Sequence, residues 1–153
     1  MGRHHYLFNG LRLSPAAVRS IVTAVPDSLY DTALDPDRFT LRFALSHLVD
    51  WEPIMLSRIK ACVEQPGTMI YGIDEGQRAI DEHYENWDVL ETLDRFDKGR
   101  AEIVAYCQGL SPEEWARTAV HNERGEMSAL DWAWTIVGHD MYHIEQFAAY
   151  LRA

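Results

Sequence analysis

The sequence has no long apolar run. None of its hydrophobic stretches approaches the roughly 20 consecutive apolar residues that a membrane-spanning helix needs. The first residues, MGRHHYLFNGLRL, lack the long apolar centre of a secretory signal. Basic residues are also scarce: 14 Lys and Arg against 24 Asp and Glu give a net charge of −10, which repels phosphate backbones. We therefore expect a cytoplasmic protein that binds neither membranes nor nucleic acid.

Cysteine is almost absent. The chain has two cysteines, Cys62 and Cys107, and both fall within helical patterns. A buried free cysteine packs as a small hydrophobic side chain, and disulfides are rare in the cytoplasm. We predict two reduced thiols in the core.

Several short catalytic signatures are missing as well. The chain contains no G-x-S-x-G, no P-loop, no G-x-G-x-x-G and no C-x-x-C. These motifs carry nucleophilic serine chemistry, phosphate binding, dinucleotide binding and dithiol or metal chemistry. Their absence removes the commoner enzyme classes from consideration.

No segment alternates with period two, so we expect no half-buried strand. Helical periodicity runs through most of the chain instead. The first helix is expected to begin with Ser14 as its N-cap and Pro15 at its first position. The main helices are predicted at about 15–25, 40–64, 88–108 and 128 to nearly the C-terminus, with a short helical stretch at 77–86.

The connections between these helices are long, at about 26–40, 64–88 and 108–128. Four amphipathic helices of this length in 153 residues are typical of one compact domain. The sequence therefore predicts a single all-α domain over residues 1–153, a four-helix bundle with long crossover connections.

Two charges interrupt apolar stripes. In the second and third main helices, seven positions spaced alternately by four and three residues are apolar except for the middle one, which is Glu52 in one helix and Arg100 in the other. An unpaired buried charge is strongly penalised. We predict that Glu52 and Arg100 form a buried ion pair.

The last helix is apolar on two sides. One stripe includes Trp134, Val137 and Met141, and the other includes the histidines discussed next. A helix with two apolar faces must be covered on both. The second cover is either a neighbouring helix or another subunit, and we predict a homodimer.

His139 and His143 lie four residues apart in that helix, within GHDMYH. Positions i and i+4 lie on one face of a helix, so both rings can point to one metal ion. The pair alone is more often a pair of satisfied core histidines. A third candidate ligand, His47, lies at the edge of the apolar stripe of the second main helix. The other histidines, at positions 4, 5, 83 and 121, are read as solvated.

Three long segments together resemble the DinB-like (YfiT-like) superfamily of bacterial four-helix metalloproteins. They are FTLRFALSHLVDWE, RFDKGRAEIVAYCQGLSPEEW and GEMSALDWAWTIVGHDMYHIEQ, and the resemblance covers the chain from about residue 12. By this resemblance, His47, His139 and His143 match the metal-binding triad of the family. The family fold is a four-helix bundle with a long crossover, and its members are often dimers. Some relatives use low-molecular-weight bacterial thiols as co-substrates.

Three neutral histidines leave an open coordination position, as in catalytic zinc sites. An imidazole site also suits nickel, so we expect a divalent metal ion, zinc or nickel, with a small-molecule substrate and a thiol as a possible co-substrate. The expected reaction is thiol transfer or hydrolysis. The alternative is a non-catalytic metal-binding or small-ligand-binding stress protein.

The sequence identifies no general base. Asp50, Asp140 and Glu145 are the nearest carboxylates, and helical geometry turns each away from the histidines. Four large side chains close to the triad are expected either to form apolar walls of a pocket or to be plain core residues. They are Trp51, Trp132, Ile136 and Tyr150.

Overall fold

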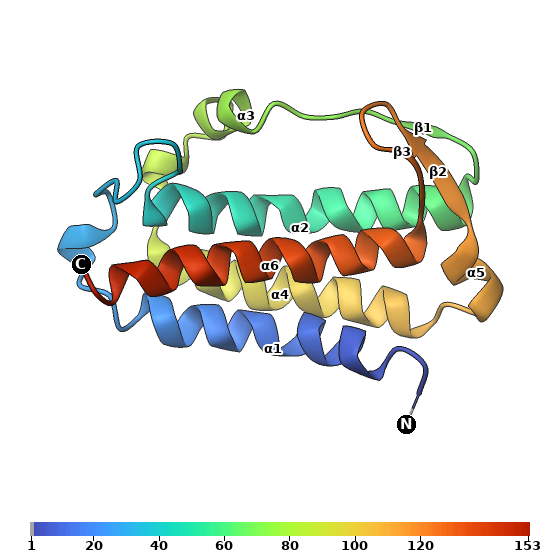
Figure 1. Cartoon of the computed structure of the whole chain (residues 1–153), viewed down its shortest axis with the longest axis horizontal. Coiled ribbons are helices and arrows are strands. Elements are labelled where there is room, and N and C mark those ends of the chain that lie inside the picture. Colours follow the sequence, from blue (N-terminus) through green and yellow to red (C-terminus); the bar gives the residue numbers. More distant parts are fainter. Residues whose placement is uncertain (1) are drawn as a thin grey trace.

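A computed structural model describes residues 2–153. Four long helices dominate it (Figure 1). They are α1 (His5–Val22), α2 (Leu41–Glu64), α4 (Val89–Gln108) and α6 (Ala129–Tyr150). The prediction of an all-α four-helix bundle is confirmed. In the described part of the chain, no helix is long and apolar enough to cross a bilayer.

The order of the helices around the bundle explains the long connections. Helices α1 and α2 each pack against both α4 and α6, so α1 and α2 lie on one diagonal. Figure 1 shows α2 and α4 running in one direction and α1 and α6 in the other. Two helices that run in parallel cannot be joined by a short turn. The chain must therefore return along the bundle between α2 and α4, which is the predicted crossover.

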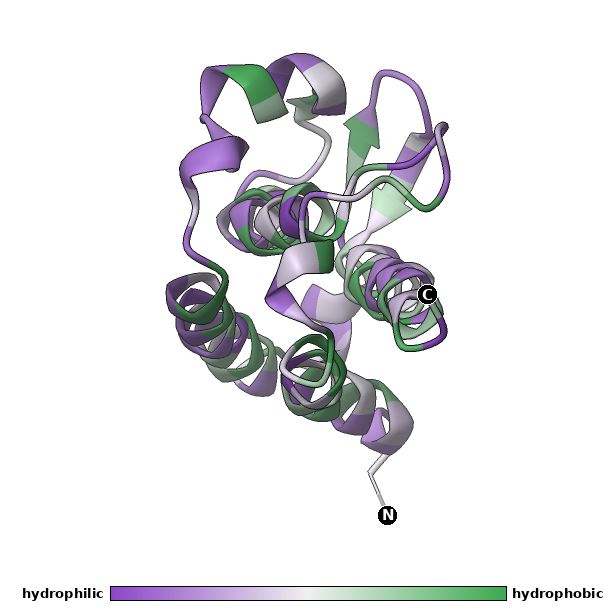
Figure 2. Cartoon of the chain, turned by 90° about the vertical axis from the view of Figure 1, so that its left-hand side faces the viewer, coloured by the Kyte–Doolittle hydropathy of each residue, from purple (hydrophilic) through white to green (hydrophobic). Residues whose placement is uncertain are grey.

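The connections carry small elements of their own. A 3₁₀ turn, η1 (Asp27–Leu29), precedes α2. The crossover contains β1 (Met69–Ile70), α3 (Glu75–Asp81) and η2 (Tyr84–Asn86). The connection between α4 and α6 contains α5 (Pro112–Ala116), β2 (Thr118–His121) and β3 (Gly125–Ser128). Viewed along the helices, α3 and the strands lie outside the bundle on one side (Figure 2).

The expectation of no strands was wrong. Strands β2 and β3 form an antiparallel hairpin, and β1 pairs with β2 in parallel, with Met69 opposite Val120 and Ile70 opposite His121. These strands have two to four residues each, which is too short for an alternating pattern to be visible in sequence. The sheet joins the crossover to the second long connection.

The start of α1 was also predicted wrongly. The helix begins at His5, so Pro15 lies inside it rather than at its first position. Proline has no N–H to donate to the carbonyl four residues earlier. That carbonyl, of Leu11, accepts a hydrogen bond from Arg100 Nη1 instead, at 3.1 Å. The irregularity in α1 therefore supplies a partner for a buried charge.

The predicted ion pair between Glu52 and Arg100 is confirmed and is larger than expected. Arg100 donates to both Glu52 oxygens, at 2.9 and 2.8 Å, and to both Asp140 oxygens, at 2.6 and 2.8 Å. All three side chains are buried, and they separate two hydrophobic clusters along the bundle axis. Asp140 was not predicted as a partner, because it lies on neither apolar stripe of α6.

A glycine permits close contact of α2 and α4 at this level. A Cβ added to Gly99 would lie 2.9 Å from Glu52 Cβ, closer than real Cβ atoms approach. The two backbones can therefore approach each other only because residue 99 has no side chain. This close approach is next to Arg100, where the charge cluster forms.

The two predicted thiols, Cys62 and Cys107, are free and buried. The second apolar stripe of α6 is only partly covered within the chain. Val137 packs against Gly10 of α1, whereas Trp134 and Met141 are exposed. A neighbouring helix thus covers part of the face, and the homodimer stays a prediction.

Candidate metal centre

Three histidines from two helices meet at one point. His47 comes from α2, and His139 and His143 come from α6. His139 Nε2 lies 2.9 Å from His47 Nε2 and 3.1 Å from His143 Nε2. All three nitrogen atoms lie within 4.8 Å of one another. The structure therefore brings together the three side chains that the sequence analysis selected.

A hydrogen-bond chain fixes the tautomer of His143. Gln146 Nε2 donates to the Phe39 carbonyl at 2.6 Å, so the Gln146 Oε1 atom faces His143 Nδ1, 3.0 Å away. An amide oxygen only accepts, so the His143 proton is on Nδ1. The lone pair on His143 Nε2 therefore points at the centre of the triad. Such an outer partner is typical of metal-ligating histidines.

Three neutral rings cannot form a hydrogen bond at each of the two short contacts between their Nε2 atoms. With no proton on His143 Nε2, a single N–H on His139 Nε2 can donate well to only one of its two close neighbours. Nitrogen atoms bound at 2.0–2.1 Å to one tetrahedral ion would lie roughly 3.3 Å apart, close to the separations observed here. The three nitrogens thus fit a divalent cation held by His47, His139 and His143. The second nitrogen of His47, Nδ1, is buried without a hydrogen-bond partner among the described residues.

Burial keeps the three rings neutral. Desolvation, followed by the charges of the other two rings, lowers the pKa of His47 to about 2. Desolvation is also the main cause that lowers the pKa of His139 and that of His143 to about 4. A metal ion binds the neutral form of imidazole, so these shifts keep the ligands available well below neutral pH.

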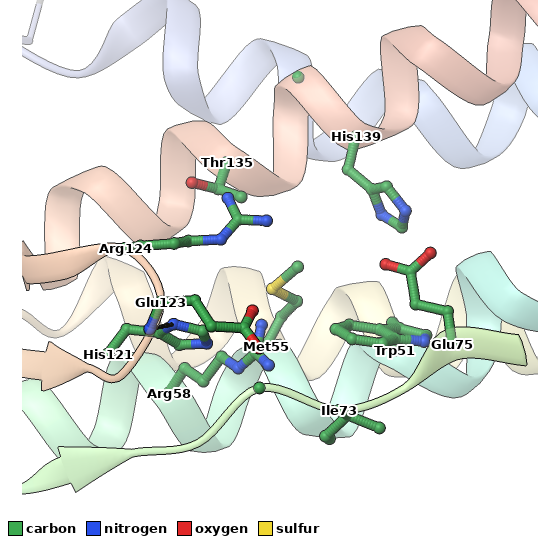
Figure 3. A pocket seen from close by; sticks show the side chains of 12 residues that line it. Trp51, Met55, Arg58, Ile73, Glu75, His121, Glu123, Arg124, Thr135 and His139 are labelled. Atoms are coloured by element: carbon green, nitrogen blue, oxygen red, sulfur yellow. Dashed lines mark hydrogen bonds between the residues drawn. The ribbon is translucent and has the colours of Figure 1, made fainter. Parts of the chain in front are cut away.

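A pocket of about 390 Å³ borders the triad at His139. Figure 3 shows the pocket between α2, α6 and the crossover segment, with His139 pointing into it from α6. Its lining includes several charged side chains. They are Arg58, Glu75, Glu123 and Arg124.

Glu75, which the sequence analysis missed, lies between two cavities at the triad. It lines the pocket just described and a second one of about 400 Å³ that reaches His47 and His143. Its carboxylate points toward His139 (Figure 3). Desolvation raises the pKa of Glu75. Glu75 lies within the predicted connection at about 64–88, and only the fold of the crossover brings it to the triad.

The crossover is anchored to α2 by Asp50. Arg78 donates to both Asp50 oxygens, and Tyr84 Oη donates to Asp50 Oδ2 at 2.7 Å. Asp50 therefore serves to hold α3 and η2 against the bundle. The expectation that it turns away from the histidines is consistent with this role.

The reading of His121 as solvated was wrong. Its side chain is buried in β2 and lines the pocket, where its ring packs against Trp132. His121 belongs to a strand that the sequence did not reveal, which explains the error. His83 is exposed, as expected. His4 and His5, which were also read as solvated, are half-buried at the start of α1.

The predicted pocket walls fall into two groups. Trp51 lines the pocket, and Trp132 packs behind it against Arg58 and His121. Ile136 belongs to one hydrophobic cluster and Tyr150 to the other, where the Tyr150 hydroxyl donates to the Thr32 carbonyl. Ile136 and Tyr150 are therefore core residues.

The sequence matches the family model of the DinB superfamily over residues 11–147. A comparison with curated proteins gives no match. Two solved structures are similar to the fold. One is YfiT from Bacillus subtilis, described as "a probable metal-dependent hydrolase with an unusual four-helix bundle topology". The TM-score is 0.91 at 19% identity, covering 99% of this chain and 89% of that one.

The second similar structure is a mycothiol-dependent maleylpyruvate isomerase. The TM-score is 0.74 at 11% identity, covering 92% of this chain and 58% of the isomerase. At these identities the likeness concerns the fold. The four-helix arrangement is thus shared with proteins whose descriptions name metal-dependent or thiol-dependent activities.

Proposed function

This chain belongs to the DinB superfamily, and on that basis we propose that it is a metal-dependent enzyme acting on a small molecule. His47, His139 and His143 hold the metal ion, which is zinc or nickel. The observation that carries the proposal is that the three histidines whose nitrogens converge all line one pocket of about 400 Å³, and His139 also lines the neighbouring pocket of about 390 Å³. A sealed triad would favour the alternative, a non-catalytic metal-binding protein.

The protein residues have separate tasks in this scheme. A divalent ion held by the three neutral histidines would supply Lewis acidity and would lower the pKa of a bound water or thiol. Gln146 orients His143 through the Nδ1 proton. Trp51 forms an apolar wall that excludes water from one side of the pocket.

Glu75 is the group that accepts and returns protons. It is the carboxylate that points toward His139 in the pocket (Figure 3). Desolvation raises the pKa of this carboxylate above its ordinary value, which is the direction that favours general acid–base catalysis. In hydrolysis or thiol transfer, Glu75 takes the proton of the attacking water or thiol and delivers it to the leaving group.

The reaction is hydrolysis or thiol transfer to a small electrophile. The description of YfiT supports the first, and that of the mycothiol-dependent isomerase supports the use of a thiol. We propose further that the protein acts in the cytoplasm as a homodimer, through the exposed Trp134 and Met141 face of α6. A monomer mass in light scattering at micromolar concentration would rule out the dimer.

The test begins with metal content. Protein made without an affinity tag is stripped with chelator, reloaded with zinc or nickel and analysed by mass spectrometry. We expect one ion per chain, and none in His139→Ala, which should remain folded by circular dichroism. His121→Ala is the matched control, because it removes a pocket histidine outside the triad. Retention of one ion with unchanged affinity in His139→Ala would overturn the proposal.

Activity is then measured with the reloaded protein. Aryl esters test hydrolysis, and a thiol with a chloronitrobenzene electrophile tests transfer. We expect Glu75→Gln to bind metal normally but to lose about 10²- to 10⁴-fold in turnover, the usual contribution of a general acid–base group. Full activity in Glu75→Gln would exclude the proposed role of Glu75.

A further inference from the structure

Arg58 is a buried cation at the base of the pocket. Its side chain is only 5% exposed. The guanidinium carbon lies 5.0 Å from the ring of Trp51 and 4.8 Å from the ring of Trp132. Two indoles therefore cover much of the guanidinium, and Arg58 is among the residues that line the pocket (Figure 3).

No carboxylate of the described residues pairs with this charge. The Arg58 guanidinium makes no hydrogen bond to a side chain of the described residues. The charges that act on it are the more distant ones of three pocket residues, Glu75, Glu123 and Arg124. Arg100 and Arg78, by contrast, each donate hydrogen bonds to both oxygens of a carboxylate. Glu75 and Glu123 are themselves exposed. Arg58 thus differs from the other strongly buried arginine in having its donors unused.

An unpaired buried guanidinium costs free energy. The side chain loses most of its contact with water, and cation–π contacts with two indoles return only part of that loss. The consequence is visible in the pKa of Arg58, which desolvation lowers. The indoles shield the faces of the guanidinium, so only its edge, where the N–H groups are, remains for a partner.

A second donor belongs to the same pocket. The backbone N–H of Glu123 donates to His121 Nδ1 at 3.2 Å, which leaves the proton of the neutral ring on Nε2. His121 and Arg58 both pack against Trp132. The floor of the pocket thus offers N–H donors and no acceptor of comparable burial.

We propose that Arg58 binds a carboxylate of the substrate or co-substrate, so that the pocket selects carboxylate-bearing small molecules and turns their reactive end toward His139. This inference rests on the function proposed above, because it treats the pocket beside the triad as the substrate site. A planar carboxylate matches the edge of a guanidinium through two parallel hydrogen bonds. Arg58 is in these terms a residue for binding and specificity.

The experiment compares an acid with its amide. 3-Phenylpropionate and 3-phenylpropionamide are titrated into chelator-treated protein, and the indole N–H signals of the five tryptophans are followed by NMR. The wild-type protein should bind the acid at least about tenfold more tightly than the amide, because a charge-assisted hydrogen bond is lost with the amide. Arg58→Met should bind the acid and the amide about equally tightly, and Arg58→Lys should show an intermediate preference for the acid.

Arg95→Met is the matched control. Arg95 also stacks on a tryptophan, with its guanidinium carbon 3.8 Å from the Trp87 ring, but it is exposed and lies outside the pocket. This variant should keep the full preference for the acid. Equal binding of acid and amide by the wild type, or a preference that survives in Arg58→Met, would overturn the proposal. So would a preference for phenyl phosphate over the carboxylate.

The metal-free protein keeps the two proposals apart. If the triad binds no metal but Arg58 still selects the acid, only the proposed function fails. If the triad binds metal and the acid is not preferred, only the assignment to Arg58 fails. Arg58→Lys provides a folded variant with the charge retained, should Arg58→Met unfold.

Discussion

Helix α2 carries buried polar groups on two faces, and their surroundings differ. On the face toward α4, Glu52 meets Arg100, which also binds Asp140, and both carboxylates are paired through both oxygens. On the face toward α6 and the sheet, Arg58 has no ionic partner and His47 Nδ1 has no hydrogen bond among the described residues. On the first face every buried charge has a partner within the chain, whereas on the second face buried polar groups lack one among the described residues.

The difference separates structure from function. A buried charge is tolerated when its partners are also buried and correctly placed. Where partners are missing, the desolvation cost stays in the folded protein unless a ligand meets it. The incomplete face of α2 is the one that borders the pocket. The predictions that follow test this contrast by removing groups from one face or the other.

The largest effect is expected from Arg100→Leu. This change leaves the Glu52 and Asp140 carboxylates buried and unpaired, so it should cost about 3–5 kcal/mol of unfolding free energy or prevent folding. Glu52→Leu added to Arg100→Leu should restore only part of the loss, since Asp140 remains. Asp140→Leu as a third change should restore most of it. The measurement is urea unfolding, and equal stability of the double and triple variants would remove Asp140 from the cluster.

The pH dependence of the metal-free protein comes next. The pKa of His143 is lowered to about 4 in the folded state, against an ordinary value of 6.5. The unfolded chain therefore takes up the proton first as pH falls, and stability is lost below about pH 6.5. At about 1.4 kcal/mol per pH unit, the loss attributable to His143 is on the order of 2 kcal/mol at pH 5.

Urea unfolding at pH 7 and pH 5, with chelator present, measures this loss. Glu52, whose pKa burial raises to about 7, acts in the opposite direction, because the folded protein then holds a proton that the unfolded chain has released. The informative quantity is thus the difference between wild type and His143→Gln. The variant should lose less stability on acidification, and an equal loss would mean that His143 is not held neutral.

A smaller effect is expected from Gly99→Ala on the complete face. The new Cβ meets Glu52 Cβ at 2.9 Å, which forces α2 and α4 apart. Overpacking of this kind costs about 1–3 kcal/mol, and the better helix propensity of alanine returns about 1 kcal/mol. Gly138→Ala is the control, since nothing lies within 4 Å of its added Cβ. Thermal unfolding should show a lower midpoint for Gly99→Ala and an unchanged or higher one for Gly138→Ala.

The smallest effect on stability is expected from Arg58→Met. The change removes two cation–π contacts, but it also removes a desolvated charge and breaks no ion pair. We expect the unfolding free energy to change by less than about 1 kcal/mol, in contrast to Arg100→Leu. A loss as large as that of Arg100→Leu in the same urea experiment would contradict the division of α2 into two faces.

The sequence was sufficient for the groups that repeat with the helices. Glu52 and Arg100 interrupt regular apolar stripes, and His139 and His143 are spaced by one turn, so helical geometry alone indicates where they meet. Asp140 lies off both stripes of α6 and therefore gave no signal. The strands gave none either, because pairing between distant segments of two to four residues depends on the completed fold.

Arg58 could have been found from sequence. His47, Trp51 and Arg58 are spaced by four and seven residues, which places all three on one face of α2. Glu75 could not, since its position depends on the sheet and on the anchoring of α3 to Asp50. Long-range placement of this kind is set by tertiary contacts that no local pattern records.

The segment from the end of β1 to Arg78 in α3 is fixed at its two ends. β1 is paired with β2 at one end, and at the other Arg78 is bound to Asp50. Between these attachments, residues 71–77 cross beside the pocket and carry Glu75, while the histidines belong to the bundle. Insertions or substitutions in this bridge can therefore reshape the ligand space without moving the triad. The shape of the ligand space and the position of the three histidines are therefore set by separate parts of the chain.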